Sequence, residues 1–334
     1  MIVSPQRGIL FLEVDAEDRP LVLERFPEAQ ILDRPLDGDA ILKEANKAEI
    51  ISCFVQSSFD AQTLKKLPQL KLLCTRSVGY DHIDLEAAKK QRITVCNVPD
   101  YGSYVIAEHV FALLLGTLRH VEEGDKRVEG GTFDYHGLRG VALFGKTMGI
   151  VGTGRIGRHV AKIACGFGMN ILAVDQCRTK ELEEKFGVRY VSMEELLSGS
   201  DVVTLHLPAT NETEHMLDRK AFKNMKQGVV LVNTARGTLI DSQALLAALN
   251  DGTVAHALLD VLEHEKNFEE DRALIDHPNV VTTPHIAFFA DSSMRNMYLD
   301  AFQSINEFLS GKEPVHIIKA PAVVCDLPRI KKYT

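Results

Sequence analysis

The stretch Gly149-Ile-Val-Gly-Thr-Gly-Arg-Ile-Gly157 decides the fold of this chain. It joins the apolar segment Met148–Val151 to apolar residues at helical spacing, Val160, Ala164 and Phe167. Its glycines follow the pattern GxGxxG, in which the first permits a tight turn and the third lets a helix pack closely on a strand. The stretch therefore predicts a strand, a glycine-rich turn and a helix in direct succession.

Short apolar runs alternate with helical patterns on both sides of this stretch, as is typical of parallel α/β sheets. In the second half of the chain the pattern predicts six parallel strands in a doubly wound sheet. These strands are Met148–Val151, Ile171–Asp175, Val202–His206, Val229–Asn233, Ala257–Asp260 and Val280–Thr282. In the first half it predicts a compact α/β unit with strands Gly8–Val14, Ile50–Val55, Leu70–Thr75 and Ile93–Cys96.

A long helix is expected over residues 104–127 as a connector between two domains, ended by the glycines at 130 and 131. A last helix over 292–310 could return to the first domain and make it discontinuous. We therefore expect one domain from residues 1–100 and 290–334, and a second from residues 101–289. The alternation makes both domains α/β.

Composition limits the possible functions. The chain has 334 residues, 45% of them hydrophobic, and a net charge of −8, which argues against general binding to nucleic acids or anionic membranes. No apolar run is long enough to suggest a membrane span, and the N-terminus has no signal-peptide layout. The six cysteines form no CxxC pair. We expect them to be reduced and buried, in a cytoplasmic protein.

The glycine-rich turn predicts a dinucleotide site. Gly152 would permit the turn, Gly154 would let backbone amides approach a pyrophosphate, and Gly157 would allow close packing. Asp175, at the end of the next strand, would accept hydrogen bonds from ribose hydroxyls and repel a 2′-phosphate, so NAD is favoured over NADP. Arg178 could soften that preference. The alternative is that the glycines serve only a tight turn.

Polar residues stand at four further strand ends, where ligands bind in such sheets. They are His206 with Pro208, the run Asn233–Gly237, Asp260, and Thr283-Pro-His285. The guanidinium of Arg236 suits a carboxylate, although it could be a surface arginine paired with an acid. His285 suits proton exchange near neutral pH, although a lone histidine is often structural.

The acidic stretch Asp260-Val-Leu-Glu-His-Glu265 raises a further alternative, a metal site built on His264 between Glu263 and Glu265. Adjacent residues of an extended segment point to opposite sides, and zinc spacings such as HExxH are absent. We therefore expect no metal, and we expect Glu263 and His264 to be solvated loop residues.

Several motifs together resemble the D-isomer-specific 2-hydroxyacid dehydrogenases, and within that family the D-lactate dehydrogenases. They run through the chain in the family's order: Arg76–Asp84, Asn97-Val-Pro99, Ala107-Glu-His109, Gly152–Gly157, His206-Leu-Pro208, Asn233–Gly237, Asp260–Glu265 and Thr283–Ala287. The resemblance implies a Rossmann-type NAD domain, a flavodoxin-like substrate domain, and a homodimer for which helix 104–127 is a plausible interface.

The resemblance also implies the chemistry. An enzyme of this family interconverts a 2-keto acid such as pyruvate and a D-2-hydroxy acid with NAD. His285 would be the general acid and base, Glu265 its partner, and Arg236 would bind the substrate carboxylate and polarise the carbonyl. Lys266 stands where many members have proline. This departure bears on the shape of the loop and not on the assignment of Glu265.

Further contacts follow from the resemblance. The expected cofactor contacts are Gly152, Gly154, Arg155, Ile156, Gly157, Asp175, His206, Pro208, Thr213, Thr234, Ala235 and Asp260, the last facing the nicotinamide carboxamide. The expected substrate contacts are Val78, Gly79, Tyr101, Phe54 and Phe288, although each aromatic ring could be ordinary core. The alternatives are a reductase of glyoxylate, hydroxypyruvate, phosphoglycerate or a larger keto acid, and an NAD-sensing binding protein that resembles the corepressors built on this fold.

Overall fold

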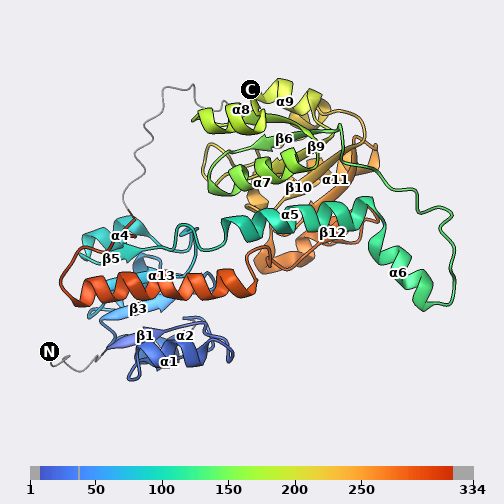
Figure 1. Cartoon of the computed structure of the whole chain (residues 1–334). Helices are drawn as coiled ribbons and strands as arrows, with labels where there is room; N and C mark the ends of the chain where they lie inside the picture. Colours follow the sequence, from blue (N-terminus) through green and yellow to red (C-terminus); the bar gives the residue numbers. More distant parts are fainter. Residues whose placement is uncertain (1–7, 37, 319–334) are drawn as a thin grey trace. The chain divides into compact units, whose positions relative to one another are not determined.

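The computed structural model describes residues 8–36 and 38–318 (Figure 1). The chain divides into two compact units, whose described residues are 8–102 with 290–318, and 103–289. The last helix within the described residues, α13 (Asp291–Leu309), belongs to the first unit. The part of the expected first domain from residue 319 to 334 lies outside the described residues.

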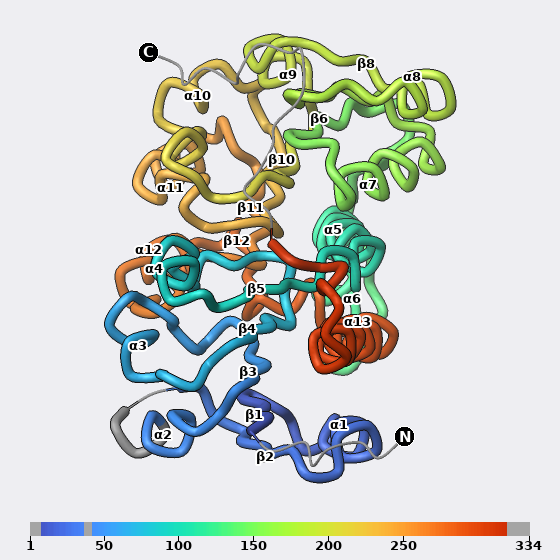
Figure 2. Tube along the Cα trace, turned by 90° about the vertical axis from the view of Figure 1, so that its left-hand side faces the viewer, coloured from blue at the N-terminus to red at the C-terminus, as the bar shows by residue number. Residues whose placement is uncertain are grey.

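The first unit is a five-stranded parallel sheet in the order β2-β1-β3-β4-β5. Its strands are β1 (Ile9–Phe11), β2 (Gln30–Ile31), β3 (Ile50–Cys53), β4 (Leu72–Thr75) and β5 (Thr94–Cys96). Figure 2 shows α2 (Gly38–Ala45), α3 (Ala61–Lys65) and α4 (Leu85–Lys90) on one face, and α1 (Arg19–Arg25) and α13 on the other. Because both faces are covered, residues of β3 and β4 are buried throughout, which explains their unbroken apolar runs.

An aromatic cluster fixes α13 on this sheet. The ring of Phe302 meets the ring of Phe11 edge-on, with centroids 5.9 Å apart, and the ring of Phe26 at 5.3 Å. Edge-to-face pairs at this separation are favourable in buried cores. The helix α13 is therefore part of the core of the first unit.

The second unit is a seven-stranded parallel sheet in the order β12-β11-β10-β9-β6-β7-β8. Its strands are β6 (Thr147–Val151), β7 (Asn170–Val174), β8 (Arg189–Tyr190), β9 (Val202–Leu205), β10 (Val229–Asn233), β11 (Val254–Leu259) and β12 (Val280–Thr282). The helices α5 (Ser103–Leu118), α7 (Arg155–Gly166) and α8 (Lys180–Phe186) share one core, and α9 (Met193–Gly199), α10 (Arg219–Lys223) and α11 (Ser242–Asn250) share the other. A short helix, α12 (Arg272–Ile275), precedes β12.

The predicted fold class, two doubly wound parallel sheets, is confirmed. The two-residue strands β2 and β8 were not predicted, because each lies at a sheet edge and is too short to show a pattern. Strand order changes direction beside β6, and the turn after β6 is the glycine-rich one. In doubly wound sheets this is where ligands bind.

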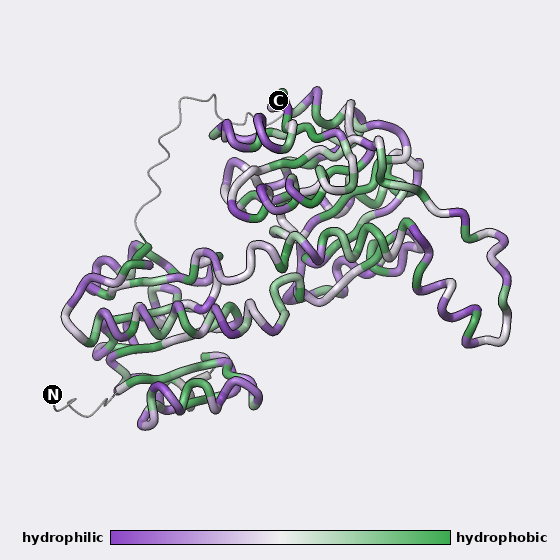
Figure 3. Tube along the Cα trace, viewed as in Figure 1, coloured by the Kyte–Doolittle hydropathy of each residue, from purple (hydrophilic) through white to green (hydrophobic). Residues whose placement is uncertain are grey.

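The single helix predicted over 104–127 is wrong, because the chain forms α5 and then α6 (Val121–Glu129) at an angle of 55°. His120 takes a left-handed conformation, with φ of 54°, and so interrupts the helix. The helix α5 is largely hydrophobic and α6 largely hydrophilic (Figure 3). On length and composition, no single helix in the described part of the chain could cross a membrane, and α5 and α6 meet the criteria only as a bent pair.

The cysteines differ in part from expectation. Cys53, Cys74 and Cys96 are free and buried, and burial raises the pKa of the Cys96 thiol to about 12. Cys165 is free but exposed, and Cys177 is exposed and disulfide-bonded. The prediction is therefore wrong for Cys165 in its burial alone, and for Cys177 in both its burial and its reduced state.

Candidate active site

The glycine-rich turn after β6 has the geometry of a phosphate cradle. Gly152 has a φ of 96°, which favours glycine. A Cβ at Gly157 would lie 2.0 Å from the carbonyl oxygen of Gly152, so α7 can approach the turn only without a side chain there. A Cβ at Gly154 would meet nothing within 4 Å, which leaves space beside the N-terminus of α7. These amides can receive a pyrophosphate.

Asp175 lies directly after β7 and is held by the same turn. Its Oδ2 accepts hydrogen bonds from the amide of Thr153 at 2.5 Å and from the Thr153 hydroxyl at 3.0 Å. Its Oδ1 accepts from the amide of Cys177 at 2.8 Å. Arg178 lies over the ring of Tyr190, with its Cζ 5.9 Å from the centroid. The carboxylate is therefore fixed at a strand end, where a ribose hydroxyl can donate to it.

Two buried polar atoms at neighbouring strand ends lack a protein partner. Within the described part of the chain, Nδ1 of His206, after β9, and Oγ1 of Thr234, after β10, make no hydrogen bond. The other ring nitrogen of His206 lies 2.9 Å from the hydroxyl of Thr204. Buried polar atoms are rarely left without a partner unless a ligand or water completes them. Together with the cradle and Asp175, these atoms fit a bound dinucleotide.

Burial lowers the pKa of His206 to about 3, so this imidazole is neutral near pH 7. The unfolded chain binds a proton there near pH 6.5, whereas the folded chain does so only near pH 3, so acid favours unfolding over that interval. We predict that wild-type unfolding free energy falls more steeply between about pH 7 and pH 5 than that of His206→Asn, by roughly 1 kcal/mol per pH unit. Urea denaturation without cofactor measures this, and equal slopes would contradict the assignment.

The other expected cofactor residues lie around the same sheet edge. Arg155 and Ile156 form the first turn of α7. The hydroxyl of Thr213 donates to the carbonyl of Pro208 at 2.7 Å, which fixes the loop after β9. The amide of Ala235 donates to the Asn233 side chain at 3.0 Å, so this turn holds its own shape. Their contacts with the cofactor remain predictions.

His285 and Glu265 come together as the sequence predicted. Nδ1 of His285 lies 3.2 Å from Oε2 of Glu265, and their side chains are 37% and 44% exposed. A carboxylate on one ring nitrogen orients the imidazole and leaves the other nitrogen for proton exchange. The ring of Phe288 stands edge-on to His285, with centroids 6.3 Å apart. The pair can act as a general acid and base that is open to a ligand.

Asp260 determines the backbone on which His285 stands. Its carbonyl accepts from the amide of His285 at 2.9 Å. Its Oδ1 accepts from the Thr283 hydroxyl at 2.5 Å and the Ile286 amide at 2.8 Å, and its Oδ2 from the Ala287 amide at 2.9 Å. These bonds bracket His285, whose φ of 54° is unusual for a residue other than glycine.

The carboxylate of Asp260 is fully buried, and both of its oxygens are engaged by the His285 loop. Nε2 of His109, from α5, lies 3.1 Å from the Thr283 hydroxyl and extends this network. Asp260 is therefore a positioning residue for His285, a role that the sequence did not indicate. Its direct contact with the nicotinamide carboxamide remains a prediction.

Arg236 follows β10 on a turn that lies against the loop carrying Glu265. Its guanidinium donates to the carbonyl of Ala235 at 2.7 Å. A Cβ at Gly237 would lie 1.9 Å from the carbonyl oxygen of Leu262 and 2.4 Å from the amide of Glu263. Only glycine allows this approach, so the backbones of the arginine turn and the glutamate loop lie in direct contact.

The expectation of solvated loop residues is wrong for Glu263, whose side chain is only 14% exposed, whereas that of His264 is 38% exposed. Glu263 pairs with His215 and accepts from the amide of Ser242, at the start of α11, at 3.0 Å. His264 pairs with the buried Asp271 at 3.2 Å, and that hydrogen bond raises its pKa. Ligand atoms of Glu263, His264 and Asp271 lie within 4.8 Å of one another, but each side chain already has a protein partner. These contacts anchor the loop on both sides of Glu265.

In the first unit, the loop after β4 offers two backbone donors. The amides of Val78 and Gly79 have no hydrogen-bond partner within the described residues, and Val78 is 38% exposed. The loop is held by the Ser77 hydroxyl, which donates to the carbonyl of Gly79 at 2.6 Å, and by Asn97, which donates to the carbonyl of Val78 at 2.8 Å. Two fixed, free amides suit a carboxylate.

The two predicted aromatic residues of this unit have different surroundings. Phe54 follows β3 and is partly exposed, whereas Tyr101 is 5% exposed.

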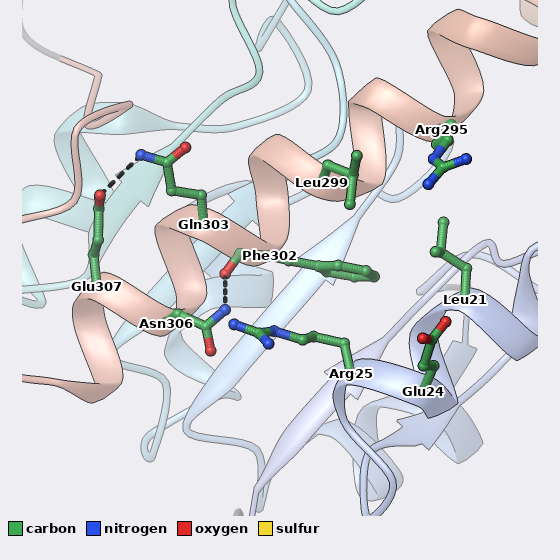
Figure 4. Close-up of a pocket in the computed structure, with 9 residues that line it drawn as sticks. All are labelled: Leu21, Glu24, Arg25, Arg295, Leu299, Phe302, Gln303, Asn306 and Glu307. Atoms are coloured by element: carbon green, nitrogen blue, oxygen red, sulfur yellow. Dashed lines mark hydrogen bonds between the residues drawn. The ribbon is translucent and has the colours of Figure 1, made fainter.

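A pocket of about 520 Å³ lies elsewhere in this unit, between α1 and α13 (Figure 4). It is lined by Leu21, Glu24, Arg25, Arg295, Leu299, Phe302, Gln303, Asn306 and Glu307. None of the predicted site residues lines it.

Comparisons with known proteins agree with this geometry. Residues 111–287 match the D-isomer specific 2-hydroxyacid dehydrogenase NAD-binding domain. A glyoxylate reductase of Pyrococcus furiosus is 36% identical over 327 residues, covering 96% of this chain and 94% of that protein. The crystal structure of D-lactate dehydrogenase from Aquifex aeolicus, complexed with NAD and lactic acid, matches at 35% identity and a TM-score of 0.86. It covers 94% of this chain and 100% of that chain.

A second solved structure, D-2-hydroxyisocaproate dehydrogenase, matches at 28% identity and a TM-score of 0.82, covering 94% of this chain and all of that one. Similarity therefore extends over nearly the whole chain. It includes enzymes named for different keto or hydroxy acids. The chain belongs to the D-isomer-specific 2-hydroxyacid dehydrogenase family, and its cofactor is NAD.

Proposed function

We propose that this NAD-dependent D-2-hydroxyacid dehydrogenase is a D-lactate dehydrogenase that interconverts pyruvate and D-lactate. The observation that carries the proposal is the pair of His285 and Glu265, a general acid with its carboxylate at 3.2 Å. Support for the substrate comes from the similarity to the lactate-bound enzyme of Aquifex aeolicus. The aromatic residues Phe54 and Phe288 would favour a side chain as small as a methyl group.

In this proposal each residue has one task. Bound NADH supplies the hydride, and the residues of this chain bind the substrate and handle the proton. Arg236 holds the substrate carboxylate and polarises the carbonyl, which stabilises charge as it develops. The free amides of Val78 and Gly79 would receive the same carboxylate. Protonated His285 donates its proton to the alkoxide oxygen, and neutral His285 takes a proton back in the oxidative direction.

A substrate panel tests the proposal. Purified protein would be supplied with NADH and, separately, pyruvate, glyoxylate, hydroxypyruvate and 2-ketoisocaproate. We expect the highest kcat/KM with pyruvate. A higher value with another keto acid would keep the reaction class and replace the substrate.

A glyoxylate reductase is the second candidate, because relatives of that name are 36% identical to nearly the full chain. Glyoxylate lacks the methyl group of pyruvate, so the ratio of the two kcat/KM values decides between them. The panel also decides against an NAD-sensing corepressor, since rapid NADH oxidation with any keto acid is the behaviour of an enzyme.

Cofactor preference gives a further prediction. Asp175→Ala should weaken NAD binding about 10- to 100-fold, because charge-assisted hydrogen bonds to the ribose are lost. The gap between NAD and NADP should narrow, because the carboxylate no longer repels a 2′-phosphate. Thr153→Val is the matched control, since it removes a bond to Asp175 but keeps the carboxylate. Kinetics with both cofactors measure this, and an unchanged preference in Asp175→Ala would contradict the role.

We also propose that the protein is a homodimer. Between α5 and β6 the second unit extends α6 and a long loop away from its sheet (Figure 1). This arm, residues 119–146, exposes Val121, Val128, Phe133, Tyr135, Val141 and Phe144, with Phe133 at 96% and Phe144 at 81%. Large exposed apolar side chains in one segment mark interaction surfaces, and a second copy of this chain is the occupant that we propose.

Light scattering after size-exclusion chromatography tests the dimer. We expect twice the chain mass for the wild type. Phe133→Ser combined with Phe144→Ser should shift it toward the monomer, whereas Phe268→Ser, at an exposed phenylalanine outside the arm, should not. A monomeric wild type would contradict the proposal.

A further inference from the structure

Three neighbouring strands of the first unit bring Glu13, Phe54 and Arg76 to one edge of its sheet. Glu13 follows β1, Phe54 follows β3 and Arg76 follows β4, and these strands are adjacent and parallel (Figures 1 and 2). The loop with the free amides of Val78 and Gly79 begins at the same edge. Ligands of doubly wound sheets bind at such carboxyl ends.

The carboxylate of Glu13 holds the turn after β3. It accepts hydrogen bonds from the amide of Phe54, from the amide of Ser57 at 2.6 Å and from the Ser57 hydroxyl at 3.1 Å. The Ser57 hydroxyl in turn accepts from the amide of Leu36 at 2.9 Å. Bonds to an ionised acceptor are about twice as strong as neutral ones, so this carboxylate fixes the turn that bears Phe54.

The backbone of Glu13 is itself held by Arg76. The Nη2 of this buried arginine donates to the carbonyls of Leu12 and Glu13, both at 2.7 Å. Its Nη1 donates to the carbonyl of Ser52 at 3.1 Å, and Tyr298 lies under the guanidinium at 4.9 Å. Arg76 therefore joins the ends of β1, β3 and β4 with α13.

Glu13 stands in a left-handed conformation, with φ of 56°. Such a conformation costs energy in a residue other than glycine, and it persists where surrounding contacts require it. Here those contacts are the hydrogen bond from Arg76 to the Glu13 carbonyl and the three hydrogen bonds that the Glu13 carboxylate accepts. Backbone outliers of this kind gather at functional sites, and His285 is another in this chain.

We propose that Glu13 is a positioning residue that sets the size of substrate side chain accepted by this enzyme. By fixing the turn at Phe54–Ser57, it fixes the ring that limits the space for that side chain. This inference rests on the proposed function, because it requires Phe54 to face the substrate. It differs from a purely structural role, which would lower stability without changing selectivity.

The test is Glu13→Gln, which keeps the shape but replaces one acceptor oxygen by a donor that faces a backbone amide. Hydrogen exchange should show at least about tenfold weaker protection at the Phe54 and Ser57 amides. The ratio of kcat/KM for pyruvate to that for 2-ketoisocaproate should fall about tenfold, carried mainly by KM. NADH affinity should stay within about twofold, because the cofactor site lies in the other unit.

Two further variants make the test decisive. Glu49→Gln, which breaks an exposed pair with Lys71 at the amino end of the same sheet, should change neither readout. Ser57→Ala loses only the hydrogen bonds of the hydroxyl. It should change amide protection and the kcat/KM ratio in the same direction as Glu13→Gln, but by a smaller factor. It also serves if Glu13→Gln does not fold.

Each outcome has one meaning. Unchanged protection would overturn the claim that the carboxylate holds the turn. Lost protection with equal losses for both keto acids would make Glu13 a structural residue only. A wild-type protein that reduces no keto acid would refute the proposed function and the selectivity role, while the exchange result still decides whether Glu13 holds the turn.

Discussion

His285→Ala is expected to lower kcat by about 10²- to 10⁴-fold while NADH binding is retained. The imidazole is the group placed to exchange a proton, with Glu265 on its Nδ1 at 3.2 Å. Without it, water must protonate the alkoxide oxygen. Stopped-flow or steady-state turnover with the best keto acid measures the loss, and quenching of NADH fluorescence measures binding.

A second substitution separates the acid from its backbone. Position 285 has a φ of 54°, which asparagine adopts more readily than alanine. His285→Asn should therefore keep the loop in place and still lose the acid. If His285→Asn keeps near wild-type turnover, His285 is not the general acid. If His285→Ala loses NADH affinity and His285→Asn does not, the lost affinity results from a displaced loop and not from the missing imidazole.

Asp260→Ala is expected to lower unfolding free energy by about 3–5 kcal/mol and kcat by about 100-fold or more. The substitution leaves the Ile286 and Ala287 amides and the Thr283 hydroxyl without their buried acceptor. Unpaired buried donors are costly, and the loop would move to find new partners. A shift of about 1 Å at His285 is enough for a loss of this size.

Controls distinguish this local effect from general damage. Asp276→Ala removes an exposed carboxylate that pairs with Arg272 and should change stability and turnover little. Asp260→Asn keeps the side-chain volume but sets an amide group against one of the donors. Its losses of unfolding free energy and kcat should therefore lie between those of Asp276→Ala and Asp260→Ala. Full turnover in Asp260→Ala would show that the loop holds His285 without this carboxylate.

Much of the fold could be predicted because its signals are local. Apolar runs gave the long strands, and the glycine spacing gave the turn beside β6. The two-residue strands β2 and β8 carry too few residues for a pattern. The break between α5 and α6 could not be foreseen, since it depends on a left-handed histidine at 120 rather than on glycine or proline.

The candidate site divides in the same way. The pairing of His285 with Glu265 was predicted from the resemblance to the family, whose pattern these motifs match. The contacts that position such residues join segments far apart in the chain, as Glu13 does with Phe54 and Glu263 with His215. A single sequence has no signal for these pairs, so Glu263 was expected in solvent, Glu13 was not singled out, and no contact was predicted for His109.

The contact of Gly237 with the Leu262–Glu263 peptide limits how this enzyme can be recombined with its relatives. A chimera that takes only the Arg236 turn from a relative places this turn against a loop of different sequence. A mismatch at the contact would displace Arg236 and Glu265 together, two of the three proposed catalytic groups. Segments 233–239 and 260–271 are therefore best exchanged as a single block. The same contact means that a larger residue can replace Gly237 only if the loop opposite also changes, for example in length.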